Sequence, residues 1–141
     1  MSFKVSLMLK DPPVILIYAE GTATPAEIEL MIEAIQGVLR EHDLMETFNY
    51  TIVDARNATM ALADIMRLAA SERDHRRGAI GDTLSQMIFV GSHTMLRVTR
   101  DLYLQSNTAS PIPIFATYEE ALAFIHEMDA AEARRSRGDR E

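Results

Sequence analysis

The sequence predicts an α/β fold with a mostly parallel, mixed β-sheet of about five strands and four helices. Short runs rich in β-branched residues recur along the chain, and two of them end at a glycine. Segments with apolar residues at helical spacing lie between these runs, which gives the order β-β-α-β-α-β-α-β-α. The 141 residues contain no linker and no internal repeat, so we expect a single domain.

The first elements are a strand pair and a helix. Residues 3–9 alternate weakly between apolar and polar and stop before two prolines, which indicates an edge strand antiparallel to the next. Residues 14–19 form a short apolar run that ends at Gly21, as expected for a buried strand. Thr24 and Glu27 flank Pro25 in a capping-box pattern, and an apolar face then continues to about His42.

The middle of the chain alternates in the same way. A strand is expected at residues 50–54, and a helix should begin between Asn57 and Ala61, with Asn57 and Thr59 as candidate N-caps, and end near Gly78. A buried strand at residues 86–90 precedes a third helix from about His93 to Leu104.

The final elements are a short strand at residues 112–115, placed at a sheet edge by Pro113, and a helix that opens with Thr117 and Glu120 in a second capping box. The apolar face of this helix ends at residue 128. We therefore expect one domain over residues 1–128 and a charged, frayed tail over residues 129–141. The helices should cover both faces of the sheet.

Composition excludes several classes of function. The formal net charge of −7 gives an acidic body without the basic stripe of a nucleic-acid-binding protein. No apolar run is long enough to cross a membrane, and the amino terminus lacks a signal-peptide pattern. The chain contains no cysteine, which favours a reducing compartment. We expect a cytoplasmic protein that binds neither nucleic acid nor membrane.

No recognisable catalytic or cofactor-binding signature is present. The loop from Glu20 to Thr24 has one glycine and fits neither a dinucleotide nor a phosphate loop, and no G-x-S-x-G or H-E-x-x-H occurs. The four histidines have no i,i+4 spacing. A phospho-acceptor receiver domain would need paired acids and a late lysine, whereas Glu20 stands alone and no lysine follows Lys10. We expect no catalytic residue, no metal site and no cofactor.

Ligands of parallel sheets bind at the loops that follow the carboxyl ends of the strands. The most polar of these expected loops runs from Asp54 to Thr59. One interpretation is structural, with Asp54 bonded within the loop. The other is a recognition or regulatory surface formed by Asp54, Arg56, Asn57 and Thr59, in which a helix N-terminus would favour an added phosphate on Thr59. A small-ligand-binding protein or an enzyme that uses the carboxyl-end loops is the alternative function. A homodimer through an edge strand is a third interpretation.

Several segments together resemble the STAS family of SpoIIAA-like domains. The resemblance lies in residues 14–27, in Ile52-Val53-Asp54-Ala55-Arg56, in residues 88–103 and in residues 115–122, and it covers about residues 3–126. It implies a STAS fold and a non-enzymatic regulatory module that docks on a protein partner of anti-sigma or kinase-like type. The family's phosphorylated serine lies in a D-S-S-G motif, which this chain lacks; Thr59 is the nearest hydroxyl after Asp54.

Overall fold

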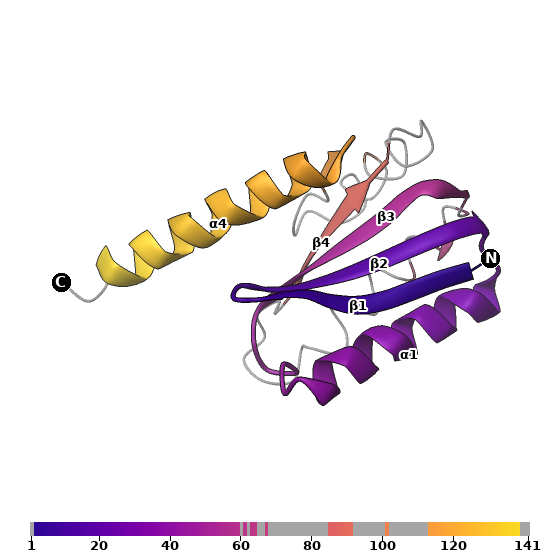
Figure 1. Cartoon of the computed structure of the whole chain (residues 1–141), viewed down its shortest axis with the longest axis horizontal. Helices are drawn as coiled ribbons and strands as arrows, with labels where there is room; N and C mark the ends of the chain where they lie inside the picture. The colour runs from indigo at the N-terminus through magenta and orange to yellow at the C-terminus, as the bar shows by residue number, and fades with distance from the viewer. Residues whose placement is uncertain are drawn as a thin grey trace.

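The computed structural model describes residues 2–59, 61, 63–64, 67, 85–91, 101 and 113–138. Within these residues the chain forms a five-stranded sheet in the order β1-β2-β3-β4-β5, with helices α1 and α4 (Figure 1). The predicted α/β fold with a mixed sheet is confirmed. The elements are β1 (Ser2–Lys10), β2 (Pro13–Thr22), α1 (Pro25–Glu41), β3 (Asn49–Thr59), β4 (Ser85–Val90), β5 (Ile114–Phe115) and α4 (Tyr118–Gly138). The helices predicted to reach Gly78 and to span residues 93–104 lie largely outside the described residues.

Strand β1 pairs antiparallel with β2, and the pairs β2–β3, β3–β4 and β4–β5 are parallel, so the expected antiparallel edge strand is confirmed. The register of β1 shifts between Leu7 and Leu9, which is a β-bulge. Both lysines of the chain, Lys4 and Lys10, lie on this strand. A bulge and lysines are common devices that discourage an edge strand from pairing with another sheet.

Helix α1 begins as the sequence predicts. Thr24 is the N-cap, its hydroxyl oxygen accepts a hydrogen bond from the Glu27 amide at 3.3 Å, and the Glu27 carboxylate accepts one from the Thr24 amide at 3.1 Å. Pro25 occupies the first turn, where its missing N–H costs no hydrogen bond. The helix ends at the C-cap His42, and its buried face is Ile28, Met31, Ile32, Ile35 and Leu39.

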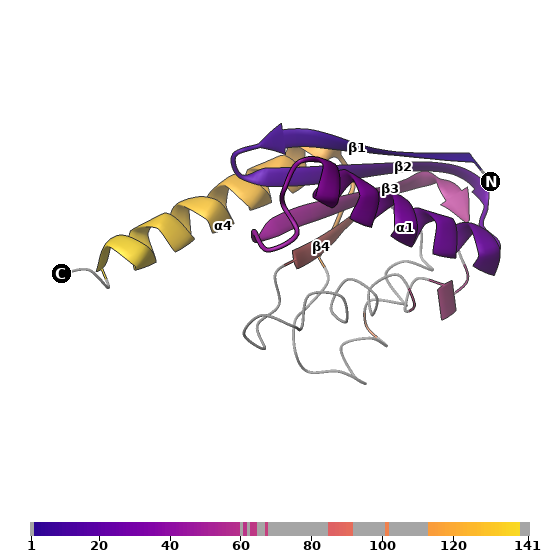
Figure 2. The same cartoon turned by 90° about the horizontal axis from the view of Figure 1, so that it is seen from below.

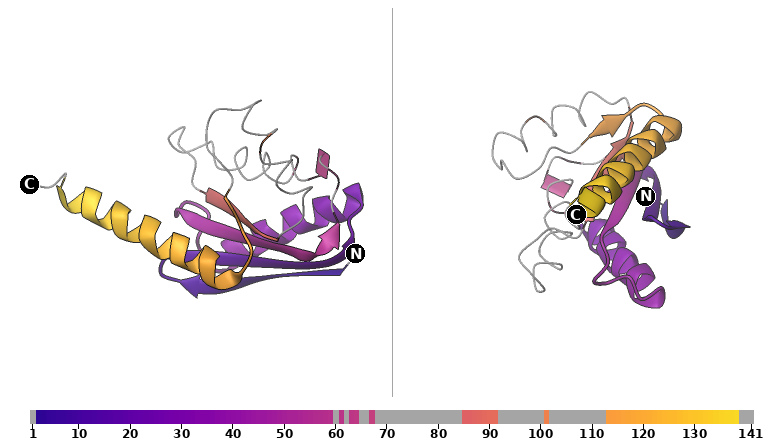
Figure 3. Two further views of the ribbon diagram at one scale, coloured as in Figure 1. Left: turned by 90° about the horizontal axis from the view of Figure 1, so that it is seen from above. Right: turned by 90° about the vertical axis from the view of Figure 1, so that its left-hand side faces the viewer.

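Successive strand residues point to opposite faces of the sheet, and this alternation divides the core in two. Ile15, Ile17 and Ala19 of β2 pack toward α1, together with Val53 and Phe89 from the neighbouring strands. The intervening strand positions face α4. The buried residues on this side are Val14, Tyr50, Ile52, Ile88 and Val90 of the strands and Ala121 and Ile125 of α4. The two helices therefore cover opposite faces, as Figures 2 and 3 show.

Helix α4 starts next to the carboxyl ends of the parallel strands. The Phe89 amide donates to the Pro113 carbonyl at 3.0 Å and the Gly91 amide to the Phe115 carbonyl at 2.8 Å, which holds β5 against β4. Thr117 accepts a hydrogen bond from the Glu120 amide at 3.2 Å, as the second capping box predicts. The helix continues to Gly138, so residues 129–138 are helical and not the frayed tail that the lost apolar face suggested.

Candidate functional site

The segment from Asp54 to Thr59 is part of strand β3, which corrects the loop expected from the sequence. Tyr18 of β2 pairs with Asp54, but Glu20 pairs with Asn57, so β3 contains one extra residue and forms a β-bulge. The pairing then continues to Thr22 and Thr59, past Gly21, whose φ of 89° suits a glycine. Asn57 and Thr59 therefore lie within the strand and are not helix N-caps.

The bulge determines which side chains face outward. Ala55 and Ala58 both belong to the core on the α1 side, although Ala58 is the third residue after Ala55. In a regular strand such residues would face opposite sides, so the extra residue is what keeps both alanines buried. Arg56 and Asn57 follow one another between the two alanines and are both exposed. The bulge thus presents two consecutive polar side chains at the surface.

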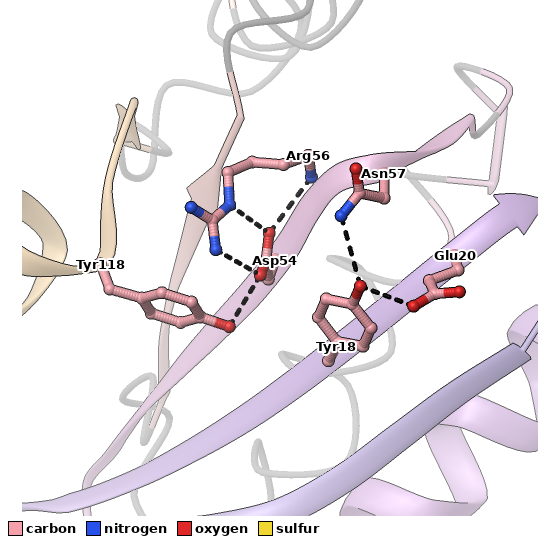
Figure 4. Close-up of polar contacts among 6 residues, drawn as sticks. All are labelled: Tyr18, Glu20, Asp54, Arg56, Asn57 and Tyr118. Atoms are coloured by element: carbon pink, nitrogen blue, oxygen red, sulfur yellow. Dashed lines mark hydrogen bonds and ion pairs between the residues drawn. The ribbon is translucent and has the colours of Figure 1, made fainter.

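Asp54 is the buried centre of a polar network (Figure 4). Its carboxylate has no exposed surface and accepts hydrogen bonds at 3.0 Å from Nε and from Nη2 of Arg56. The Arg56 amide donates to the same carboxylate at 3.2 Å, and the Tyr118 hydroxyl donates to it at 2.8 Å. A buried carboxylate is stable only with such partners, so this arrangement satisfies Asp54 and fixes the groups around it.

Arg56 is held on two sides but stays accessible. Nε and Nη2 of its guanidinium both donate to the Asp54 carboxylate. Its Cζ atom lies 4.9 Å from the centre of the Tyr118 ring in a cation–π contact. Its side chain remains 40% exposed. The outer nitrogen of the guanidinium points away from Asp54 (Figure 4). The cation is therefore oriented in advance and partly exposed, with one guanidinium nitrogen directed away from Asp54.

A second set of contacts lies beside the first. The Tyr18 hydroxyl donates to the Glu20 carboxylate at 2.6 Å and accepts a hydrogen bond from the Asn57 side-chain amide at 3.3 Å. These three residues come from β2 and β3, and Figure 4 shows them next to the Asp54 network. Together the two sets form a polar cluster at the carboxyl ends of the central strands, in which Asp54 is buried. Its members are Tyr18, Glu20, Asp54, Arg56, Asn57 and Tyr118.

The ionisation of the network follows from its contacts. Burial acts to raise the pKa of the Asp54 carboxyl, but the hydrogen bonds from Arg56 and Tyr118 outweigh it, and the pKa lies below its usual value. Burial and the bond to Asp54 raise the pKa of the Tyr118 hydroxyl. The bond to Asp54 also raises the pKa of Arg56. At neutral pH the network is therefore a carboxylate paired with a guanidinium and a neutral phenol.

The four site residues predicted from the sequence differ in their exposure to solvent. Asp54 is buried and cannot itself form an exposed contact surface, whereas Arg56, Asn57 and Thr59 are exposed. Thr59 ends β3, and its carbonyl accepts a hydrogen bond from the Ala23 amide at 2.9 Å. Tyr118 was not predicted as a site residue from the sequence. It directly follows the helix-capping Thr117, and only the expected position of that helix over the strand ends would have indicated it.

The predictions that the chain has no metal site, no cofactor and no membrane span come from the sequence. Among the described residues no group of three or more His, Cys, Asp or Glu is arranged to hold a metal ion, and no helix is long and apolar enough to cross a membrane. A hollow of about 250 Å³ opens at the other end of the sheet, lined by Leu7, Met8, Leu9, Lys10 and His42. It lies away from the carboxyl ends where the sequence predicted ligand contacts.

The sequence matches no protein-family model, and it matches no curated protein. Its structure is similar to that of the anti-sigma factor antagonist SpoIIAA in its unphosphorylated form, with a TM-score of 0.59 at 13% identity. This match covers 89% of the present chain and 98% of the SpoIIAA chain.

A second similar structure is an uncharacterised protein of the DUF3478 family from Shewanella loihica PV-4, which has a SpoIIAA-like fold. The TM-score is 0.57 at 12% identity, over 87% of this chain and 91% of that one. The chain therefore has the SpoIIAA-like, or STAS, fold that the resemblance predicted. At such identities the similarity establishes the fold alone.

Proposed function

We propose that this chain is a non-enzymatic protein-interaction module of STAS type, and that Arg56, Asn57 and Thr59 form the surface that contacts its partner. The observation that carries the proposal is the β3 bulge, which places Arg56 and Asn57 side by side at the surface while Ala55 and Ala58 stay buried. Bulges of this kind re-aim side chains and are enriched next to functional sites.

Asp54 has a supporting role in this proposal. It orients the Arg56 guanidinium through two bonds of 3.0 Å, and the Tyr118 ring supports the same cation. Arginine loses less freedom on binding when its fork is already fixed, so an oriented Arg56 is well suited to a carboxylate or carbonyl group on a partner protein. Glu20 beside it adds an acceptor for a basic group.

The choice of partner class is supported by the similarity in fold to SpoIIAA, which is an anti-sigma factor antagonist. For the present chain we propose a protein partner of anti-sigma or kinase-like type. Thr59 is exposed at the end of the same surface, and an added phosphate there would place negative charge next to the contact residues. Phosphorylation of Thr59 would then weaken or redirect the interaction.

A quantitative pull-down from the native cells tests this proposal. Wild-type chain, Arg56→Glu and Thr59→Glu serve as baits, and Arg40→Glu, an exposed position in the last turn of α1, is the matched control. We expect a specific protein on the wild-type and Arg40→Glu baits and at least about tenfold less of it on the other two. Recovery of no specific protein, or an unaltered profile for both Arg56→Glu and Thr59→Glu, would contradict the proposal.

A further inference from the structure

Helix α4 runs back along strand β3 toward the start of that strand. The Tyr118 hydroxyl at the beginning of the helix contacts Asp54 at 2.8 Å, and Ile125 packs in the same cluster as Tyr50, which precedes Asp54 in the strand. The stretch of strand from Tyr50 to Asp54 spans about 13 Å, a distance that a helix covers in about nine residues. Past Ile125, the helix therefore reaches the amino-terminal end of β3, as Figures 1 and 2 show.

The side of α4 that faces the sheet changes from apolar to acidic on this stretch. Ala121 and Ile125 are completely buried on that side. Asp129 and Glu132 follow Ile125 at i+4 and i+7, so the helical repeat places both carboxylates on the same side, and both residues are exposed. Burial raises the pKa of the Tyr50 hydroxyl, and the negative charges of Asp129 and Glu132 raise it further, which agrees with a position close to both.

Tyr50 carries a buried hydroxyl to this point. The residue is only 3% exposed, and within the described part of the chain its hydroxyl has no hydrogen-bond partner. The buried polar side chains on either side of it in the sequence, Asn49 and Thr51, are bonded to each other at 3.5 Å. Buried phenols usually have a partner, and a buried polar group without one is unfavourable. The Tyr50 hydroxyl is therefore an unused donor and acceptor next to acidic side chains.

Two large apolar side chains next to these polar groups are open to solvent. Phe48 packs edge-to-face on Tyr50, with ring centres 5.2 Å apart, and is 42% exposed. Met128, which precedes Asp129 on α4, is also 42% exposed. The face of an aromatic ring attracts a cation. A ring, a carboxylate and a phenol oxygen together suit a guanidinium, which stacks on aromatic rings and forms forked hydrogen bonds with carboxylates.

The charge at this end of the sheet is negative. Glu132 has a further interaction of its own, so the carboxylate that matters here is that of Asp129, which forms no ion pair among the described residues. Glu46, two residues before Phe48, adds a further acidic side chain. The arginines of α4 begin at Arg134, more than one helical turn past Asp129.

From this arrangement we infer that Phe48, Tyr50, Met128 and Asp129 form a second docking surface, which binds an arginine side chain in a basic segment of a partner protein. Asp129 pairs with the guanidinium, the Phe48 ring lies against it, and the Tyr50 hydroxyl accepts a hydrogen bond from it. The occupant is a protein segment because the exposed Phe48 and Met128 add apolar contacts that a lone amine would leave unfilled. The surface lies at the opposite end of β3 from Arg56, so the inference does not depend on the function proposed above.

NMR titration of the whole chain with a synthetic peptide tests the inference. The probe is a blocked nonapeptide of glycine and serine with Leu-Arg-Leu at its centre, and matched peptides carry lysine or neutral citrulline in place of the arginine. The arginine peptide should shift the amide resonances of Phe48, Tyr50 and Asp129 with a Kd of about 1 mM or below. The citrulline peptide should bind at least about fivefold more weakly, because it cannot pair with the carboxylate, and the lysine peptide should lie between the two.

Variants of the chain identify the groups that bind the probe. Asp129→Asn and Phe48→Ala should each weaken binding of the arginine peptide at least about fivefold. Glu119→Gln, at an exposed acidic position in the first turn of the same helix, is the matched control and should bind as the wild type does. Tyr50→Phe should also weaken binding, but the urea midpoint of the free chain should not fall, because the hydroxyl has no hydrogen bond to lose. Circular dichroism verifies that each variant is folded.

Four results would overturn the inference. One is an arginine peptide that leaves the three resonances unmoved at about ten times the expected Kd. Another is equal affinity for the arginine and citrulline peptides. The third is a folded Asp129→Asn chain that binds the arginine peptide as tightly as the wild type. The last is a Tyr50→Phe chain with a lower urea midpoint and unchanged peptide binding, which would assign the hydroxyl a purely structural role.

Discussion

Replacing Asp54 by asparagine removes the charge at the centre of the polar network and keeps the side-chain shape. The variant loses charge-assisted hydrogen bonds from Arg56, each of a kind worth about 1.5–3 kcal/mol, while the introduced amide can still accept from one donor. Because the Arg56 side chain is 40% exposed, water compensates part of the loss. We expect the free energy of unfolding to fall by about 2–3 kcal/mol, toward the lower end of what breaking a buried ion pair costs.

Urea denaturation measures this change. With the slope usual for small proteins, the midpoint should move down by about 1–2 M. Asp43→Asn is the matched control, since Asp43 is exposed and has a φ of 57°, a conformation that asparagine tolerates equally well. It should stay within about 0.5 kcal/mol of the wild type. If Asp54→Asn also stays within that range, the network does not hold the end of β3, and our account of Arg56 is wrong.

Three further predictions concern the same parts of the fold. Tyr118→Phe loses the 2.8 Å bond to Asp54 but keeps the ring under Arg56, so it should cost about 1 kcal/mol in the same assay; no loss would mean that the hydroxyl contributes nothing. The folded pKa of Asp54 lies below its usual value of 3.8, so its stabilisation is complete above the unfolded pKa and disappears as the pH falls through the folded one. Stability measured between neutral and acidic pH should therefore fall less steeply in Asp54→Asn than in the wild type, and equal slopes would contradict this. Ile125→Ala should cost about 2–4 kcal/mol because Ile125 is completely buried between α4 and the sheet, and calorimetry that shows a much smaller change would place α4 elsewhere.

The elements that the sequence predicted well are those with strong local signals. The helix that follows Thr24 combines a capping box, a proline at its start and a regular apolar face, and its observed bounds match the prediction. The strand pair at the amino terminus was equally clear, because the two prolines after Asp11 interrupt it. Local patterns of this kind depend on residues close together in the chain.

The extension of β3 to Thr59 depends on contacts that such patterns do not contain. Residues 55–59 are mostly polar or small, which is typical of a loop, but they pair with the end of β2 after the bulge. The contact between Asp54 and Tyr118 joins residues 64 positions apart. Both features arise from the way the sheet and α4 come together, so the loop and the helix caps expected at residues 54–59 were wrong, and the role of these residues in recognition stays a prediction.

Site-specific photo-crosslinking in the native cells tests the central claim most directly. A photoreactive residue at Asn57 should form an adduct with a specific protein, and the same residue at Glu33 on α1 should not. The Asn57 adduct should disappear when Arg56→Glu is introduced into the same chain. Identical adducts from both positions, or an Asn57 adduct that persists in Arg56→Glu, would show that the exposed end of β3 is not the docking surface.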